Sequence, residues 1–223
     1  MIALNGIPCH RAELQVPWTG SWIAKVALDG TVAPAGRVTL TWGNAILIGT
    51  VDPTSSGVWQ GEAFATVIGG IGWSSELPAG WLQNDAGLQG ASVAQQAATL
   101  AGEVLTAPPA AFRLLRVSYA RVRRTASRVL QDVLASMVWW VEYGGTTRAG
   151  ARVALPVPPR VEVLEYDPLE GWADLDADDV GQTLVGSVIP AAPPRRLQAL
   201  RIVELCARAD GAGQRIRAGV EVM

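Results

Sequence analysis

The sequence predicts a mainly β protein with some helix (α+β), built around small antiparallel β-barrels or sandwiches. Side chains at 22–28 alternate between two faces, which is the period of a strand with one buried face. Turn-forming residues at 29–30, 43–44 and 52–57 separate the extended stretches. Several short strands at this spacing must close on themselves or on a second sheet, because open edges pair with other chains.

In the first half, the strands are expected at 12–16, 20–28, 36–42, 45–52 and 58–69. Residues 74–90 are rich in turn formers and are expected to form a surface loop. A helix is predicted at 92–105, with Ser92 and Gln95 as the two members of a capping box. Its apolar stripe is Val93, Ala97, Leu100, Ala101 and Val104. Pro108 and Pro109 follow it and mark the best domain boundary.

The second half repeats this order of strands and helix. A strand is predicted at 112–117 and a helix at 121–137, with Val122, Ala126, Val129, Val133 and Met137 along its apolar side. Further strands are expected at 138–143, 151–155, 161–166, 183–189, 197–206 and 214–222, with a hairpin turn at 208–213. We therefore predict two β domains, 1–110 and 111–223, each with one packed helix.

The chain is poor in charge for a protein that stands alone. Of its 223 residues, 49% are hydrophobic and 17% are charged, with a mean hydropathy of +0.23. An ordinary domain carries roughly 25% charged residues. The deficit favours a surface that faces other protein subunits, since we find no apolar run long enough to span a membrane and no signal peptide. The net charge of −2 argues against general nucleic-acid binding.

Nine tryptophans stand against two phenylalanines and three tyrosines. Indole rings are favoured both in cores and where two surfaces meet, so packing inside the chain and between subunits are both consistent with this count. Arg121, Arg123, Arg124 and Arg128 form a basic start to the second helix, and Arg128 is expected to pair with Asp132. These arginines fit a phosphate contact, acidic loops of a partner subunit, or a solvated face.

No catalytic arrangement can be recognised. His10 is the only histidine, and the adjacent Cys9 would point to the opposite face of an extended segment. Cys9 and Cys206 are expected to be buried free thiols, and His and Cys are too few for a zinc site. We expect no catalytic residue, cofactor or metal, although a carboxylate pair that forms only in the fold stays open.

An acidic cluster lies at Asp174, Asp176, Asp178 and Asp179. Counted from Asp174, the sixth and twelfth positions lack the glycine and glutamate that a calcium loop needs there. We therefore interpret the cluster as a solvated acidic turn.

Several short motifs resemble those of a known family. In the first half they are 16–22 (VPWTGSW), 36–40 (GRVTL), 47–51 (LIGTV) and 67–73 (VIGGIGW). In the second half they are 125–130 (TASRVL), 138–145 (VWWVEYGG), 166–171 (YDPLEG) and 184–186 (LVG). Together they resemble the baseplate hub proteins of tailed bacteriophages, which are related to the hub part of contractile tails and type VI secretion spikes.

The resemblance implies two tube-like β-barrels, each with a helix, in a homotrimer that adapts a six-fold tail tube to a three-fold tip. Such a ring lets DNA pass without specific binding and meets the tail tube or distal tail protein, the spike or fibre proteins and the tape measure protein. The implied location is the virion tail tip, after assembly in the host cytoplasm. On this view the subunit-interface candidates are Trp18, Trp22, Trp73, Trp81, Arg121, Arg124 and Arg128.

Three alternatives stay open. A distal tail ring protein would be six-fold rather than three-fold. A carbohydrate-binding or cell-wall-binding β module fits the tryptophan count. A wall hydrolase fits least, since no compact catalytic signature is present.

Overall fold

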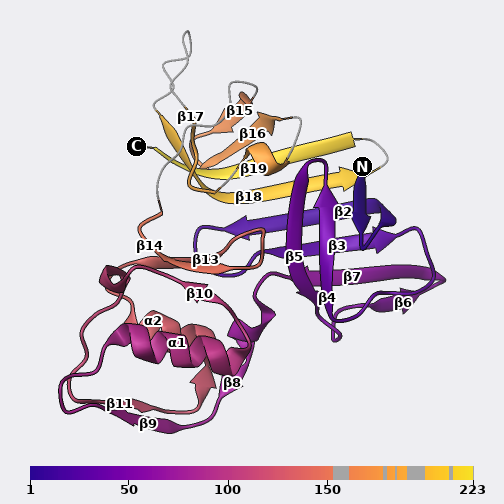
Figure 1. Cartoon of the computed structure of the whole chain (residues 1–223). Helices are drawn as coiled ribbons and strands as arrows, with labels where there is room; N and C mark the ends of the chain where they lie inside the picture. The colour runs from indigo at the N-terminus through magenta and orange to yellow at the C-terminus, as the bar shows by residue number, and fades with distance from the viewer. Residues whose placement is uncertain (153–160, 178–179, 184, 190–198, 211–212, 223) are drawn as a thin grey trace. The chain divides into compact units, whose positions relative to one another are not determined.

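The computed structural model describes all residues except 153–160, 178–179, 184, 190–198, 211–212 and 223. The described chain is mainly β with two α-helices (Figure 1), as the sequence predicts. It divides into two compact units. Unit 1 comprises Met1–Trp18, Trp22–Gly69 and Val153–Met223, and unit 2 comprises Thr19–Ser21 and Gly70–Arg152.

Unit 1 is one twelve-stranded sheet. Its strands are β1 Ile2–Leu4, β2 Ile7–Pro17, β3 Ile23–Leu28, β4 Arg37–Trp42, β5 Ala45–Val51, β6 Gly57–Trp59, β7 Glu62–Ile68, β15 Glu162–Asp167, β16 Trp172–Asp176, β17 Val188–Ile189, β18 Leu200–Asp210 and β19 Gly213–Val222. The order β1-β4-β5-β7-β3-β2 closes into a barrel because β1 also pairs with β2. All of these pairings are antiparallel, and closure removes the exposed edges that an open sheet would leave.

The C-terminal strands extend this same sheet. From β2 it continues through β18, β19 and β16 to β15, with β17 on β18. The two separate barrel domains predicted at 1–110 and 111–223 are not confirmed, because β18 pairs with β2 along six residues of each strand. The predicted strands at 36–42 and 45–52 are present almost to the residue, whereas 58–69 is two strands joined by a turn at Gln60 and Gly61.

The barrel core is built around Trp22, which is fully buried. Gly49 and Gly69 make room for it, since a Cβ atom at Gly69 would lie 2.3 Å from the indole ring. Trp42 is 1% exposed, and its Nε1–H donates to Gln214 Oε1 at 2.7 Å, so this indole links the barrel to β19. Burial of large aromatic rings of this kind contributes much of the stability of a small core.

Unit 2 packs two helices between short strands. They are α1 Gly90–Ala101 and α2 Ala126–Val133, with β8 Glu76–Leu77, β9 Gly80–Gln83, β10 Leu105–Thr106, β11 Ser118–Arg121, β12 Arg124–Thr125, β13 Val138–Val141, β14 Thr147–Gly150 and the 3₁₀ turns η1 Ile71–Ser74 and η2 Pro109–Ala111. β10, β14 and β13 form one small sheet, while β9 with β11 and β8 with β12 form two-stranded pairs (Figure 1). The two helices contact each other, rather than each serving a different barrel.

Several predictions for unit 2 are wrong in detail. Helix α1 begins at Gly90 with no side-chain cap, so the capping box of Ser92 and Gln95 does not form. Its buried residues are Gly90, Val93, Ala94, Ala97 and Ala98, whereas Leu100 is 50% exposed. It ends at Gly102, whose left-handed conformation is a common helix terminator.

Helix α2 is half as long as predicted. Arg124 and Thr125 pair with β8 as a strand, and Leu134 is extended, so only 126–133 is helical. Residues 112–117 are not a regular strand, and 74–90 contains β8 and β9 instead of a loop alone. Within the described residues, no helix has the length and apolarity needed to cross a membrane.

The acidic cluster and the C-terminal strands also differ from expectation. Asp174 and Asp176 lie on β16, where they alternate with the buried Ala173 and Leu175, so the predicted acidic turn is wrong there. Asp178 and Asp179 lie outside the described residues, as do most of the predicted strand at 151–155 and the centre of the turn at 208–213. Of the predicted strand at 183–189, only β17 is formed among the described residues.

Candidate interaction surfaces

The predicted interface tryptophans have different environments. Trp22 and Trp73 are 0% and 1% exposed, so they belong to the cores of units 1 and 2 and offer no surface to a partner. Trp73 packs on Trp139 with ring centroids 5.6 Å apart, and its Nε1–H donates to Thr147 Oγ1 at 2.7 Å. Trp18 is half-buried, with the guanidinium of Arg201 5.1 Å from its ring centroid.

Trp81 is the one strongly exposed tryptophan in this set, at 65%. It lies on β9, directly opposite Ala120 on β11. Val122, which directly follows β11, is 55% exposed. The outer face of this two-stranded ribbon is therefore mixed, because Gln83 and Ser118 lie on it beside Trp81 and Ala120.

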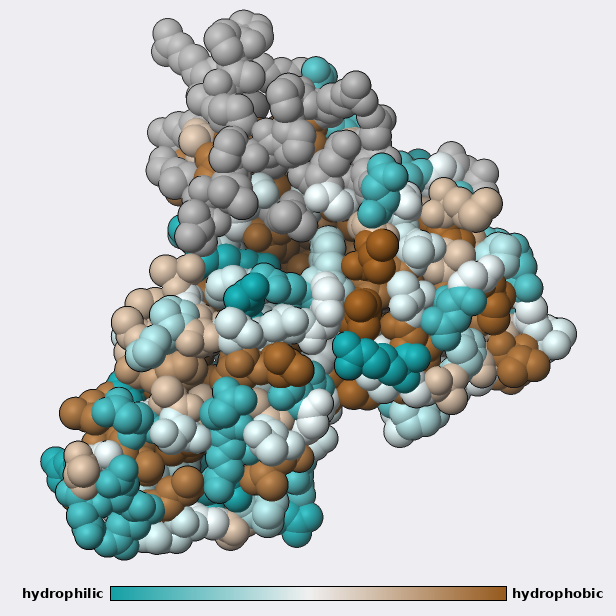
Figure 2. All heavy atoms as spheres, in the orientation of Figure 1, coloured by the Kyte–Doolittle hydropathy of each residue, from teal (hydrophilic) through white to brown (hydrophobic). Residues whose placement is uncertain are grey.

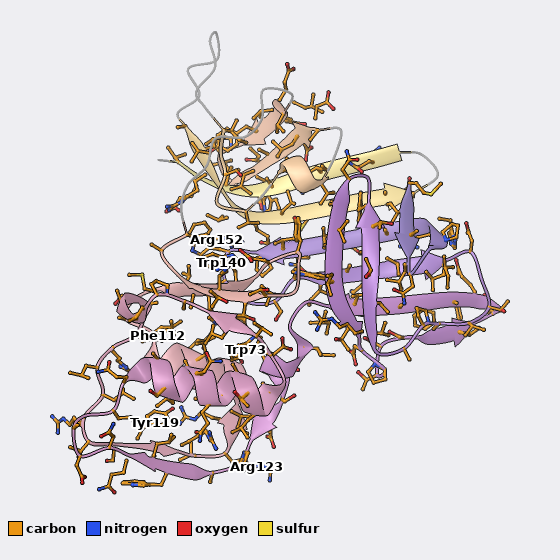
Figure 3. The ribbon with its side chains drawn as sticks, in the orientation of Figure 1. Trp73, Phe112, Tyr119, Arg123, Trp140 and Arg152 are labelled. Carbon is orange, nitrogen blue, oxygen red and sulfur yellow. The ribbon has the colours of Figure 1, made fainter. Side chains whose placement is uncertain are left out.

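On the inner face of the ribbon, Arg121 and Tyr119 form hydrogen bonds with the two helices. Arg121 is 6% exposed, and it donates to Pro78 O at 2.8 Å and to Gln96 Oε1 of α1 at 3.2 Å. Tyr119, labelled in Figure 3, donates to Asp132 Oδ2 of α2 at 3.3 Å. Arg121 is thus a structural residue, which corrects its prediction as an interface residue.

The predicted Arg128–Asp132 pair is wrong. Asp132 instead accepts from Arg124, which precedes the helix, as well as from Tyr119. Burial and the negative charge of Asp132 raise the pKa of Tyr119, so its phenol stays protonated as a donor. Arg128 is exposed and donates to Gln131, so of the three predicted arginines it alone is fully available at the surface.

Charge is unevenly distributed between the units. Residues 70–152 contain eight arginines and five carboxylates, a net charge of +3. The rest of the chain has ten basic and fifteen acidic residues, a net charge of −5. The net charge of −2 is the sum of these two opposite values. Separated charges of this kind orient proteins as they associate.

Part of the outside of the barrel consists mostly of uncharged residues. We define the barrel face as the outward-pointing residues of β3, β4, β5 and β7. They are Ile23, Lys25, Ala27, Arg37, Thr39, Thr41, Ile46, Ile48, Thr50, Glu62, Phe64, Thr66 and Ile68. Lys25 and Arg37 are cationic and Glu62 is acidic, while the other ten residues carry no charge.

The register places part of this face in continuous rows. Ile68 lies opposite both Thr50 and Ile23, and Phe64 lies opposite Ala27. Ile46 and Phe64 are 58% and 38% exposed. Figure 2 shows hydrophobic residues gathered over β5 on the side of unit 1 that faces the viewer. Sequence reasoning missed this face, although the isoleucines and threonines at alternate strand positions were its signal.

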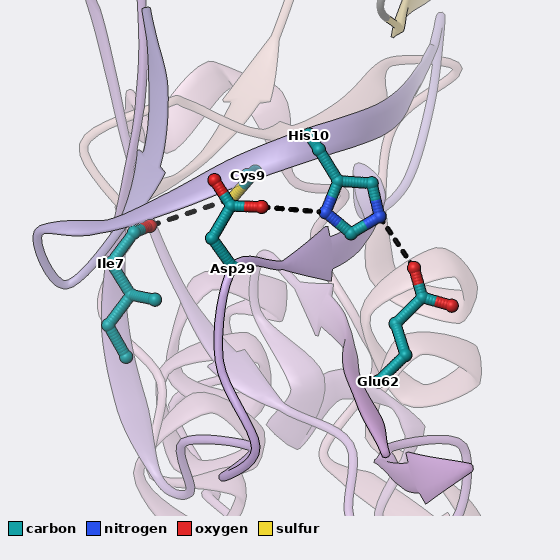
Figure 4. A network of polar contacts seen from close by, with 5 residues as sticks. All are labelled: Ile7, Cys9, His10, Asp29 and Glu62. Carbon is teal, nitrogen blue, oxygen red and sulfur yellow. Dashed lines mark hydrogen bonds and ion pairs between the residues drawn. The ribbon is translucent and has the colours of Figure 1, made fainter. Parts of the chain in front are cut away.

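His10 is held between two carboxylates. Its Nδ1 lies 2.9 Å from Asp29 Oδ1 and its Nε2 lies 2.5 Å from Glu62 Oε1 (Figure 4). Carboxylates only accept hydrogen bonds, so both ring nitrogens carry protons in this arrangement. Desolvation alone lowers the pKa of His10, but the hydrogen bonds and charges of Asp29 and Glu62 together raise it.

This geometry leaves His10 with no ring nitrogen free to act as a base for Cys9. Burial raises the pKa of the Cys9 thiol to about 11, which disfavours the reactive thiolate. Cys9 and Cys206 are free thiols, half-buried rather than buried as predicted. Among the described residues, no group of three or more His, Cys, Asp or Glu side chains is placed to hold a metal ion.

The fold was compared with solved structures. The tail protein of Neisseria meningitidis MC58 matches with a TM-score of 0.66 at 10% identity, covering 98% of this chain and 94% of that one. The 43 kDa tail protein of prophage MuSo2 from Shewanella oneidensis matches with a TM-score of 0.60 at 10% identity, over 99% and 97% of the two chains.

The Escherichia coli protein c3393 matches with a TM-score of 0.63 at 10% identity, over 100% of this chain and 77% of that one. It is a component of the type VI secretion system with structural similarity to T4 bacteriophage tail proteins gp27 and gp5. The chain has the fold of bacteriophage tail proteins. The resemblance found in short sequence motifs is thereby confirmed at the level of the fold.

Of the comparisons with known proteins, the one with solved structures finds the tail-protein fold. A scan of protein-family models finds no match to the sequence, and a search of curated proteins finds none either. At 10% identity the likeness concerns the fold, so function is argued from the surfaces of this chain.

Proposed function

We propose that this chain is a structural tail-tip hub protein that forms a trimeric ring in the virion. The observation that carries the proposal is the match of nearly the whole chain to three tail or secretion-system proteins, with TM-scores from 0.60 to 0.66. In this role the ring adapts the six-fold tail tube to the three-fold tip and lets DNA pass during ejection.

The proposal assigns the surfaces of unit 1 to assembly. The barrel of β1 to β5 and β7 is the first tube-like domain, and β15 to β19 supply the strands of the second. The barrel face, with ten uncharged residues among thirteen and with Ile46 and Phe64 exposed, is the surface that we assign to contact with another subunit. Neighbours in the particle are the tail tube or distal tail protein, the spike or fibre proteins and the tape measure protein.

The surface tryptophans do not support the carbohydrate-binding alternative. Only Trp59 and Trp81 among the nine are strongly exposed, at 67% and 65%, and they belong to different units. Each unit therefore presents one exposed indole and no cluster of sugar platforms.

Immunogold labelling of assembled particles tests the proposal. We expect gold at the end of the tail distal to the head. Labelling along the capsid, or its absence from particles that contain a complete tail, contradicts the assignment.

A further inference from the structure

We propose that the acidic edge of unit 1, at β15, docks on a basic strip of unit 2 in a second copy of this chain. This inference rests on the proposed function and specifies one contact of that assembly. It is argued from two exposed strips of opposite charge, each of which also carries two exposed aliphatic side chains.

The acidic edge comprises Glu162, Leu164, Glu165, Leu169 and Glu170. β15 ends the twelve-stranded sheet, and among the described residues it pairs with β16 alone. Leu164 and Leu169 are 59% and 96% exposed, and the three glutamates are exposed and form no ion pair with a described residue. A bulge between Val163 and Glu165 turns both Leu164 and Glu165 outward.

The basic strip comprises Arg113, Leu114, Arg116 and Val117, which lead into β11. Leu114 and Val117 are 69% and 52% exposed. Both arginines are exposed and neither forms an ion pair with any residue that the structure describes. Backbone bonds from Leu115 N to Leu88 O and from Leu88 N to Arg116 O fix this strip along one side, so its shape is set before binding.

Each strip alone exposes two aliphatic side chains next to charged side chains of one sign. Joined, they would bury four aliphatic side chains and place arginines beside glutamates in a region of reduced water access, where such pairs strengthen. The contact uses different surfaces on the two partners, so successive copies join head to tail, which is the geometry that closes into a ring. The net charges of −5 and +3 on the two units favour the same orientation.

The test uses charge reversal on the full chain, followed by sedimentation velocity. The wild-type chain is expected to self-associate, and more weakly as NaCl rises from about 0.05 to about 0.5 M. Arg113→Glu with Arg116→Glu, and separately Glu162→Arg with Glu165→Arg, each weaken association by at least about tenfold. Combining all four reversals in one chain restores it, because each reversed strip then meets its complement in the next copy.

Arg215→Glu, at an exposed arginine of β19, serves as the control and leaves association unchanged. The inference is overturned if the wild type stays monomeric, or if it associates and neither reversal affects it. It is also overturned if the arginine variant loses binding to single-stranded DNA while self-association is intact, since the strip is then a phosphate contact. Immunogold labelling tests the proposed location in the tail, and its result does not depend on these association measurements.

Discussion

Two glycines determine where the largest side chain of the barrel core can lie. A Cβ atom at Gly49 would approach Trp22 Cη2 to 2.8 Å, and one at Gly69 would lie 2.3 Å from the ring atoms Cε2 and Nε1. Neither glycine has a positive φ, so space and not backbone conformation requires them. The indole of Trp22 is fully buried and cannot move toward solvent.

Gly69→Ala is therefore expected to lower the free energy of unfolding by about 1–3 kcal/mol, through overpacking against Trp22. Urea denaturation followed by tryptophan fluorescence measures it. Gly30→Ala is the control, since a Cβ atom at Gly30 would lie 3.9 Å from its nearest neighbour, Ile7 Cγ2. Its free energy of unfolding should stay within about 0.5 kcal/mol of the wild-type value. Equal stability of the Gly69 variant and the wild type contradicts the packing argument.

His10 makes stability depend on pH. The folded state raises its pKa, so the stabilisation is complete below the ordinary pKa of histidine and is lost as pH rises through the folded value. Its side chain is 44% exposed, so the effect is at most about 1 kcal/mol. We expect the difference in free energy of unfolding between the wild type and His10→Gln to shrink from pH 5 to pH 9. A difference that does not change with pH contradicts the ion pairs of His10 with Asp29 and Glu62.

At the scale of elements, Asp132 joins α2 to the strands that cover it. It accepts from Tyr119 of β11 and Arg124 of β12, while Arg123 pairs with Glu76 of β8 at 2.6 Å. Helix α2 has only eight residues and gains most of its stability from such contacts and from its buried face.

Asp132→Asn keeps the shape of the side chain but removes the charge that Arg124 faces. Because both side chains are about one-third exposed, we expect a loss of about 1 kcal/mol in the free energy of unfolding. Arg128→Ala on the same helix breaks only the hydrogen bond to Gln131 and should cost less than about 0.5 kcal/mol. Thermal denaturation of Asp132→Asn and Arg128→Ala measures both losses of stability. If the two variants lose the same amount, the role given to Asp132 is contradicted.

Sequence periodicity predicts elements where one face is buried. β4 and β5 follow their predicted ranges because their inward residues alternate strictly with outward ones. β16 has the same alternation, with Ala173 and Leu175 inward, but the aspartates on its outer face led to its interpretation as a turn. Helix α2 is shorter than its apolar pattern because pairing with β8 holds Arg124 and Thr125 extended.

Long-range pairing and exposure could not be predicted. β18 pairs with β2, although most of the chain lies between them in sequence. No local pattern in the sequence specifies which two strands pair at such a distance. The same limit applies to tryptophan, since its large ring is favoured in cores and at interfaces alike. Trp22 and Trp81 have similar residue types nearby, yet one is fully buried and the other is 65% exposed.

At the scale of the whole molecule, the exposed apolar side chains of the barrel face are candidates for contact with another subunit. Ile46→Glu with Phe64→Glu places two like charges on that face without entering the core, since both side chains are exposed. We expect the melting temperature to change little and self-association to weaken by at least about tenfold, measured by mass photometry.

Val32→Glu is the matched control, because Val32 is 71% exposed and lies outside the strands of the barrel face. It should leave both folding and association as in the wild type. If the double variant associates as the wild type does, the barrel face is a free surface.

Electron cryo-microscopy of the tail tip in assembled particles, reconstructed without imposed symmetry, tests the proposed hub most directly. We predict three copies of this chain in one ring, with six tube-like barrels below the tail tube. Six copies would instead identify a distal tail ring, and density for the chain outside the tail would contradict the account.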